Sequence, residues 1–230
     1  MRVSDIETLP EVREAANVLA ELEKCGLVEP AIASGWTRGF LTDVSPSDID
    51  VAYVGPVPHE QAREHLRRIL SEHPTDLPNW DWDVDGIWNA ETAYKVMHTC
   101  QNYLLYYINS IDSIYLAADG RLHDPTGYGF ADAPDKTLRI NMYDRTGRKP
   151  SPKEEVYICL EGCRRIAKFG WQPTAASATR ITEGVRQWEH LTNAEQAYYR
   201  TKKIMGKYTP AERAEARLVY SRYGWAFVFD

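Results

Sequence analysis

The apolar residues of the first seventy positions repeat at helical and strand periods in turn. From Thr8 to Lys24 they recur every three or four residues, and the stretch opens on the capping-box pattern Thr8 to Glu11. Shorter patterns then predict a strand at 31–33, a helix at 37–43, a strand at 48–54 and a helix at 58–72. Helices and strands therefore alternate in the first part of the chain.

The middle of the chain is dominated by strand patterns and turn residues. Residues 80–88 alternate carboxylate and apolar side chains, which places Asp81, Asp83 and Asp85 on one face of a strand. Asp119-Gly120 is typical of a hairpin turn. The other expected elements are a helix at 91–107, a strand at 111–117, a loop at 125–136 and a short strand at 138–141.

The polar stretch from Thr146 to Pro152 predicts a linker, because it holds a glycine and two prolines. After it every pattern is helical. The expected helices lie at 153–169, 175–191, 192–204 and 209–223. We therefore predict an α+β fold, with a mixed sheet flanked by helices in a head domain at 1–145 and a helical domain at 153–230.

The composition is ordinary for a soluble globular protein, with 43% apolar and 26% charged residues. The sequence has no run of eighteen apolar residues and no signal-peptide pattern, so we expect a cytoplasmic protein without a membrane span. Its four cysteines are too few for a disulfide scaffold. Cys159 and Cys163 lie four residues apart on an expected helix, where core packing is favoured over metal binding.

Charge is distributed unevenly along the chain. Residues 1–135 hold 9 Lys and Arg against 23 Asp and Glu, a net charge of −14. Residues 136–230 hold 18 against 10, a net charge of +8. An acidic half suits metal binding and a basic half suits a polyanion such as RNA, although solvated helix faces would give the same counts.

The stretch from Ser34 to Asp50 carries the strongest chemical signal. Asp48 and Asp50 should point to the same side of a strand, with Ile49 in the core. Two carboxylates on one face repel each other, and binding a hard divalent cation is a good reason to keep them there. A small-residue turn at Ser34-Gly35 opens a helix and suits phosphate. Metal and phosphate together indicate phosphoryl or nucleotidyl transfer.

Ser34-Gly35-Trp-Thr-Arg38, followed by Asp48-Ile-Asp50, resembles the head of class II tRNA nucleotidyltransferases and bacterial poly(A) polymerases. These enzymes belong to the polymerase β-like nucleotidyltransferase superfamily. The family pattern is Gly-Gly-x-x-Arg-Asp and then Asp-x-Asp, so this chain has Ser34 for the first glycine and Gly39 for the first aspartate. The resemblance implies Mg²⁺ or Mn²⁺ on Asp48 and Asp50, and an NTP as substrate.

Two later blocks are similar to the same family. The run from Asp112 through Asp124 to Gly127, with Leu138-Arg139 after it, is similar to the next family block. Glu154-Glu155, with Arg164 further on, is similar to the first neck helix. The resemblance implies nucleotide-binding roles for Ser34, Gly35, Arg38, Asp124, Arg139, Glu155 and Arg164, although Arg164 would also suit a solvated helix face.

The superfamily often adds a third metal-binding carboxylate from a neighbouring strand. Asp112 is our first candidate, because we expect it to begin the strand at 111–117, and the family has an asparagine there. Asp83 is the second candidate, because it lies mid-strand on the correct alternation; a solvated strand face would explain it as well. The predicted catalytic and metal-binding set is therefore Asp48, Asp50 and Asp112, with Asp83 as the alternative.

Departures from the family pattern fall where the base and the acceptor would be chosen. Tyr106, Tyr107 and Ile108 replace the family's Arg-Arg-Asp. Ile158 replaces the arginine of the base-reading motif and cannot donate a hydrogen bond. The resemblance implies nucleotidyl transfer to an acceptor hydroxyl, with an RNA 3′ end favoured. Transfer to a small molecule or a protein, and a non-catalytic nucleotide-binding head, are the alternatives, and the oligomeric state is undetermined.

Overall fold

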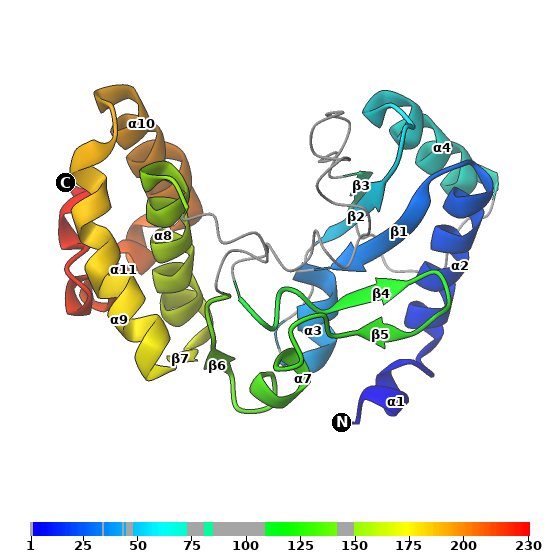
Figure 1. Ribbon diagram of the computed structural model, residues 1–230, viewed down its shortest axis with the longest axis horizontal. Helices are drawn as coiled ribbons and strands as arrows, with labels where there is room; N and C mark the ends of the chain where they lie inside the picture. Colours follow the sequence, from blue (N-terminus) through cyan, green and yellow to red (C-terminus); the bar gives the residue numbers. More distant parts are fainter. Residues whose placement is uncertain are drawn as a thin grey trace. The chain divides into compact units, whose positions relative to one another are not determined.

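The structure is a computed structural model that describes residues 2–33, 35–42, 44, 48–72, 81–84, 109–141 and 150–230. The chain divides into two compact units, Met1–Pro134 and Asp135–Asp230. Figure 1 shows a sheet with helices in the first unit and a largely helical second unit. The predicted α+β class is confirmed. The predicted domain limits at 145 and 153 stay predictions, because residues 142–149 lie outside the described part.

The first unit is built on a five-stranded sheet with the order β3-β2-β1-β4-β5. The strands β2 and β3 are parallel, and the other neighbouring pairs are antiparallel, so the sheet is mixed as predicted. The strands are β1 (Val28–Ala33), β2 (Asp48–Val54), β3 (Asp81–Val84), β4 (Tyr115–Ala117) and β5 (Leu122–His123). The helices are α1 (Val3–Ile6), α2 (Pro10–Lys24), α3 (Gly35–Leu41), α4 (His59–Glu72) and α7 (Gly129–Asp132).

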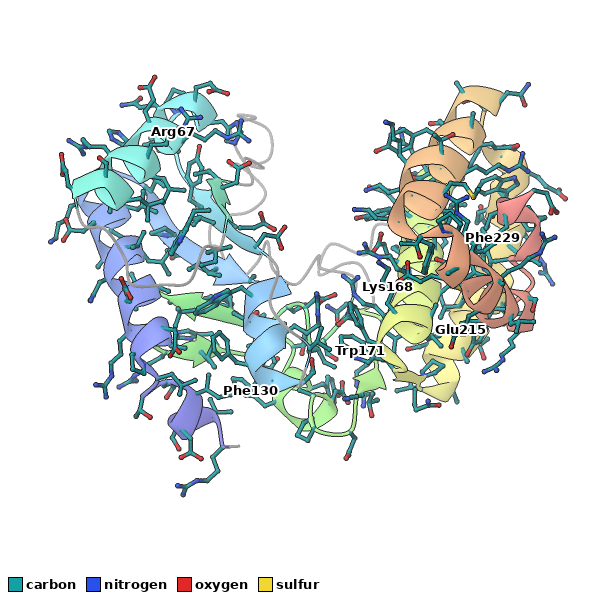
Figure 2. The ribbon with its side chains drawn as sticks, turned by 180° about the vertical axis from the view of Figure 1, so that it is seen from behind. Arg67, Phe130, Lys168, Trp171, Glu215 and Phe229 are labelled. Atoms are coloured by element: carbon teal, nitrogen blue, oxygen red, sulfur yellow. The ribbon has the colours of Figure 1, made fainter. Side chains whose placement is uncertain are left out.

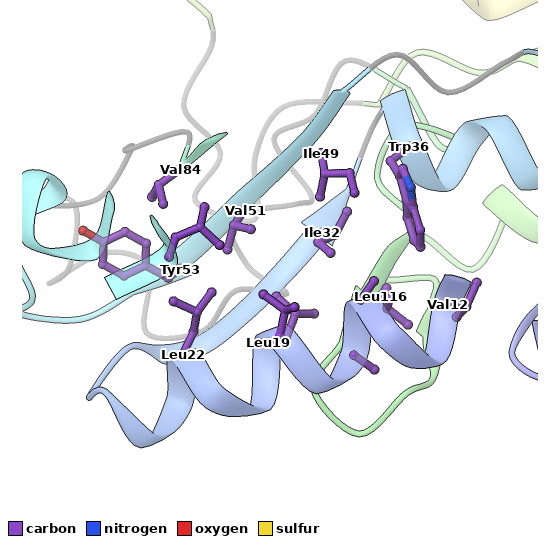
Figure 3. Close-up of a cluster of buried hydrophobic side chains, with 14 of the residues drawn as sticks. Val12, Leu19, Leu22, Ile32, Trp36, Ile49, Val51, Tyr53, Val84 and Leu116 are labelled. Atoms are coloured by element: carbon purple, nitrogen blue, oxygen red, sulfur yellow. The ribbon is translucent and has the colours of Figure 1, made fainter. Parts of the chain in front are cut away.

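One hydrophobic core holds the first unit together. Figure 3 shows apolar side chains of α2, among them Leu19 and Leu22, facing Ile32, Val51 and Tyr53 of the sheet. The apolar stripe of α4 belongs to the same cluster, and Phe130 of α7, labelled in Figure 2, packs against it. This burial removes apolar surface from water and is the main favourable contribution to folding of this unit.

Three expectations in the first unit need correction. Leu9 precedes the first residue of α2 and caps it without a side-chain hydrogen bond, so the predicted capping box at Thr8 is absent. The expected strand at 111–117 begins only at Tyr115, because residues 110–113 form a turn. The expected loop at 125–136 contains the short helix α7. Residues 85–88 and the expected helix at 91–107 lie outside the described part.

The second unit consists of helices and one small sheet. Its strands β6 (Thr137–Leu138) and β7 (Gln172–Pro173) are parallel to each other. Its α-helices are α8 (Pro152–Phe169), α9 (Ala175–Glu183), α10 (Asn193–Tyr198) and α11 (Pro210–Arg222). Between and after them lie the 3₁₀ helices η1 (Gly184–His190), η3 (Met205–Lys207) and η4 (Ala226–Phe229), and the π-helix η2 (Tyr199–Ile204).

Caps explain where the predicted helices of the second unit begin and end. The Ser151 hydroxyl accepts from the Glu154 amide in a capping box, and Gly170 ends α8 in the left-handed conformation at φ 68°. Thr209 and Glu212 form a capping box at the start of α11. The expected helices at 175–191 and 192–204 change to 3₁₀ and π geometry after Glu183 and Tyr198, respectively.

Aromatic rings and two cysteines fill the interior of the second unit. Trp188 packs edge-on against Trp225, and Tyr220 packs edge-on against Phe229, which is labelled in Figure 2. Cys159 and Cys163 are buried, as the core-packing interpretation predicted. Burial raises the pKa of both thiols, so neither readily forms the thiolate that binds metal. Within the described residues, no helix has both the length and the apolar character that crossing a membrane requires.

Gly184 marks a close approach between α8 and η1, and it gives a stability prediction. A Cβ at this position would lie 2.2 Å from the Cys159 sulfur. We expect Gly184→Ala to lower the free energy of unfolding by about 1–3 kcal/mol. The measurement is urea unfolding followed by circular dichroism. Cys159→Ala, which removes the sulfur, should restore most of the loss in the double variant, and additive losses would contradict this explanation.

Candidate active site

Asp48 and Asp50 lie at the start of β2, on the same face of the strand. Asp48 is exposed and Asp50 is half-buried, whereas Ile49 between them is fully buried in the core. The neighbouring strand β3 runs parallel in matching register, with Asp48 beside Asp81 and Asp50 beside Asp83. Paired residues on adjacent strands face the same side of a sheet. The alternation predicted from the sequence therefore places Asp48, Asp50 and Asp83 on one face at this end of the sheet.

Several chain segments meet at the end of the sheet where β2 begins. The strands β1 and β2 are antiparallel, with Ile32 beside Val51, so β1 ends near the start of β2. Directly after β1 the helix α3 begins at Gly35. The strand β4 is also antiparallel to β1, and its first residue, Tyr115, lies beside Ala33. Gly35 of the predicted phosphate turn and the predicted metal-binding pair thus lie at one end of the sheet; Ser34 is outside the described residues.

Arg38 and Asp112 form a buried ion pair at this end. The Arg38 guanidinium donates to the Asp112 carboxylate, and the two side chains are 10% and 1% exposed. The other carboxylate oxygen accepts from the Asn109 amide at 2.6 Å. Asp112 lies in the turn before β4 and not on the strand, because Asn109 accepts the amides of Ile111 and Asp112 and thereby closes the turn. Its metal-binding role stays a prediction.

Asp83, the alternative third carboxylate, is paired with Arg63 of α4. The guanidinium donates from Nε and from Nη2 to the two carboxylate oxygens, each at 2.8 Å. Burial alone would raise the pKa of Asp83, but the hydrogen bonds from Arg63 and the Val84 amide outweigh it and lower the pKa. The Asp83 side chain is 55% exposed. Both candidates for a third metal-binding carboxylate therefore have an arginine partner.

Asp124 organises the loop before α7. Its carboxylate accepts from the Thr126 amide at 3.1 Å, the Gly127 amide at 3.0 Å and the Phe130 amide at 3.2 Å. These bonds satisfy backbone N–H groups of the loop and of the first turn of α7. The predicted nucleotide-binding role of Asp124 stays a prediction, and its observed contacts shape the loop.

In the second unit Glu155 is held by an arginine that the sequence patterns did not single out. Arg180 of α9 donates from Nε at 2.7 Å and from Nη2 at 2.6 Å to the two Glu155 oxygens. A third donor, Nη1, reaches the main-chain oxygen of Asn141 at 3.0 Å. Both side chains remain about one-sixth exposed. The pair joins α8 to α9 through two parallel charge-assisted hydrogen bonds.

The remaining predicted residues also belong to the second unit. Arg164 pairs with Glu161 one turn earlier on α8, and Arg165 donates to the same carboxylate at 3.3 Å. Glu161 is buried, so these arginines compensate its charge. Arg139 is half-buried and follows β6. A structural contact therefore accounts for Arg164, whose predicted part in nucleotide binding stays a prediction.

The chemistry of the donor set fits a hard divalent cation at Asp48 and Asp50. Carboxylate oxygens are the ligands that Mg²⁺ and Mn²⁺ prefer, and two of them share one strand face here. Among the described residues, no group of three or more His, Cys, Asp or Glu side chains is placed to hold an ion. A complete site would therefore take its remaining ligands from water, from substrate phosphate or from residues outside the described part.

The sequence matches no protein-family model and no curated protein sequence. Solved structures match by fold. A structure described as a tRNA-processing enzyme, apo form I, matches with a TM-score of 0.68 and 13% identity over 96% of this chain and 59% of that chain. A CCA-adding enzyme complex with CTP matches with a TM-score of 0.67 and 14% identity over 97% and 55%.

A Thermotoga maritima CCA-adding enzyme complexed with tRNA matches with a TM-score of 0.65 and 13% identity over 97% of this chain and 54% of that chain. This chain spans between 53% and 59% of the length of the solved chains. At such low identity the match concerns the fold. The resemblance predicted from residues 34–50 and from the later blocks is thus confirmed at that level, and this chain has the fold seen in CCA-adding enzymes.

Proposed function

We propose that this protein transfers a nucleotide from an NTP to an acceptor hydroxyl and releases pyrophosphate, with an RNA 3′ end as the acceptor. One observation carries the proposal: Asp48 and Asp50 share a strand face at the end of the sheet where α3 begins. The fold supports it, because solved CCA-adding enzymes have the same architecture. Two like charges side by side reduce stability and are kept where they have a function.

Asp48 and Asp50 would hold Mg²⁺ or Mn²⁺, which when bound neutralises phosphate charge and acidifies the acceptor hydroxyl. Ile49 and Val51 fix the carboxylates, because both side chains are fully buried and leave the strand no freedom to rotate. The pairing of Asp50 with Asp83 across parallel strands fixes the backbone register further. Such rigidity suits a site whose ligands must stay within a fraction of an ångström of their positions.

The phosphates would bind at the start of α3, where Ser34 and Gly35 offer backbone N–H groups and Arg38 supplies positive charge. Glu155 would contact the base, with Asp124, Arg139 and Arg164 as further nucleotide-binding residues. RNA would bind through the second unit, since residues 136–230 carry a net charge of +8. A structure of a fold neighbour is described as a complex with tRNA, which supports RNA as the acceptor.

The test of the proposal is the fate of labelled NTPs. We expect the protein, with Mg²⁺, to place label from [α-³²P]NTP into the RNA fraction of a cell extract, and to release labelled pyrophosphate from [γ-³²P]NTP. Chelation with EDTA should stop both. Label in protein or in small molecules, with none in RNA, would support nucleotidyl transfer but identify a protein or a small molecule as the acceptor. No label in any fraction and no pyrophosphate would contradict nucleotidyl transfer itself.

A further inference from the structure

The buried carboxylate of Asp112 lies at the end of the sheet that holds the candidate active site, and its contacts show what it does there. One of its oxygens accepts from the Arg38 guanidinium and the other from the Asn109 amide. A cation placed on this carboxylate would lie next to the positive charge of Arg38, which repels it. The Asp112 side chain is also almost fully buried. These contacts favour an electrostatic tether over a metal ligand.

Arg38 needs a carboxylate that its own helix does not provide. It is buried on α3, where Gly39 follows it, and a buried guanidinium without a counter-charge is costly. Asp112 supplies the counter-charge from 74 residues further along the chain. A buried pair between segments this far apart links their positions, because breaking it would leave an uncompensated buried charge.

The segment that carries Asp112 is itself held firmly. We call residues 109–114 the 109–114 turn. Ser110 of this turn donates to Asp132 of α7 at 2.6 Å. Gly129 of α7 packs so closely that a Cβ there would lie 2.6 Å from the Ser110 carbonyl oxygen. The turn is therefore fixed against α7 on one side and can act as an anchor for α3 on the other.

A second contact runs from the same turn to α3. The Thr37 hydroxyl donates to the main-chain oxygen of Ile114 at 3.0 Å, and this bond is buried. With the Arg38–Asp112 pair, two consecutive residues of α3 are tied to the 109–114 turn. Gly35, where the phosphate turn opens into α3, lies only two residues before Thr37. The position of α3, and of Gly35 with it, therefore depends on the turn.

We propose that Asp112 is a positioning residue that acts through Arg38: it ties α3 to the 109–114 turn and so holds in place Gly35 and Arg38, to which the proposed function assigns phosphate binding. This inference rests on the proposed function for its effect on NTP binding. The tether itself is a property of the fold. It predicts that loss of the Asp112 charge loosens α3 and weakens NTP binding without changing the metal requirement.

The test is Asp112→Asn in the full chain, with Asp119→Asn, an exposed hairpin residue, as the control. We expect KM for the NTP to rise about tenfold, kcat to change much less, and the Mg²⁺ concentration for half-maximal rate to stay within about twofold. Amides of α3 should exchange hydrogen about tenfold faster. Arg38→Lys should give a similar effect that does not add to it in the double variant. Asp112→Glu, which keeps the charge, should preserve most of the wild-type behaviour.

Two results would overturn the proposal. A rise of tenfold or more in the Mg²⁺ requirement of Asp112→Asn, relieved by Mn²⁺, would make Asp112 a metal ligand. Unchanged hydrogen exchange in α3 would show that the tether is absent. If wild type turns over no NTP, the proposed function fails separately, and exchange in α3 still tests the tether. If Asp112→Asn does not fold, Arg38→Lys tests the tether through hydrogen exchange in α3, a readout that does not depend on any contact of Arg38 with phosphate.

Discussion

The rate of nucleotidyl transfer is expected to fall by about 10⁴-fold in the double variant Asp48→Asn/Asp50→Asn. Removing groups that act together in catalysis removes most of the catalysed rate. Asparagine keeps the size of aspartate but removes the charge that would hold a divalent cation. Pyrophosphate release from labelled NTP, followed over a range of Mg²⁺ and Mn²⁺ concentrations, measures the effect.

Stability gives an independent readout for the same variant. Asp48 and Asp50 each lie beside another aspartate in the register with β3, so replacing both should change the free energy of unfolding by no more than about 1 kcal/mol. Urea unfolding measures it. Lost activity with retained stability would identify the pair as functional. Lost activity with a loss of several kcal/mol would show that the two aspartates support the fold.

Asp83→Asn is the matched control, because Asp83 lies beside Asp50 in the register of the sheet but pairs with Arg63. If Asp83 serves only that surface ion pair, its variant should keep activity within about threefold, since exposed pairs contribute little. A loss similar to that of the double variant would instead make Asp83 the third metal-binding carboxylate. This comparison therefore decides between the two sequence-based interpretations of Asp83.

Local signals explain which parts of the structure could be predicted from the sequence. The strand β2 was predicted with its observed limits, because Ile49 and Val51 alternate with carboxylates at a period of two. The predicted helix at 153–169 agrees with α8 to within one residue, and Gly170 marks its end. Each of these signals is contained within a few residues of the element that it sets, so no knowledge of tertiary structure is needed.

A local side-chain hydrogen bond and a tertiary contact explain two errors. The apolar pattern at 111–117 resembles a strand, but the side chain of Asn109 hydrogen-bonds the backbone and closes a turn, which moves Asp112 off the sheet. The pattern at 175–191 predicts one continuous α-helix. In the structure the helix changes to the 3₁₀ helix η1 at Gly184, where Cys159 approaches closely. Neither Asn109 nor Gly184 is distinctive in the sequence. Asn109 acts through local hydrogen bonds, two and three residues along the chain, and Gly184 through the segment that it meets.

The partners of the candidate site residues were missed for the same reason. Arg63 and Arg180 each bind a predicted carboxylate from a different element, whereas Asn109 binds Asp112 within one turn. Sequence reasoning found the carboxylates through spacing and family resemblance. It had no signal for their partners. Arg63 is 20 residues from Asp83, and Arg180 is 25 residues from Glu155 along the chain. Only the packing of α4 on β3 and of α9 on α8 creates these pairs.

Arg180→Met is expected to reduce discrimination among the four NTPs by about tenfold to a hundredfold, if Glu155 contacts the base as proposed. Ile158 cannot donate a hydrogen bond, whereas Arg180 brings a guanidinium to the carboxylate of Glu155. Three hydrogen bonds fix this guanidinium, so little conformational entropy remains to be lost when a base binds. The measurement is kcat/KM for each NTP on the same acceptor.

A structural role for Arg180 predicts a different pattern. Removing it leaves the half-buried Glu155 unpaired, and the resulting loss of stability would lower kcat/KM equally for all four NTPs. Arg186→Met, at an exposed arginine of η1, controls for the loss of one positive charge from the same unit. Arg180→Lys separates charge from geometry, because lysine cannot donate two parallel bonds. Altered ratios between NTPs in both Arg180 variants, with none in Arg186→Met, would assign base selection to the Glu155–Arg180 pair.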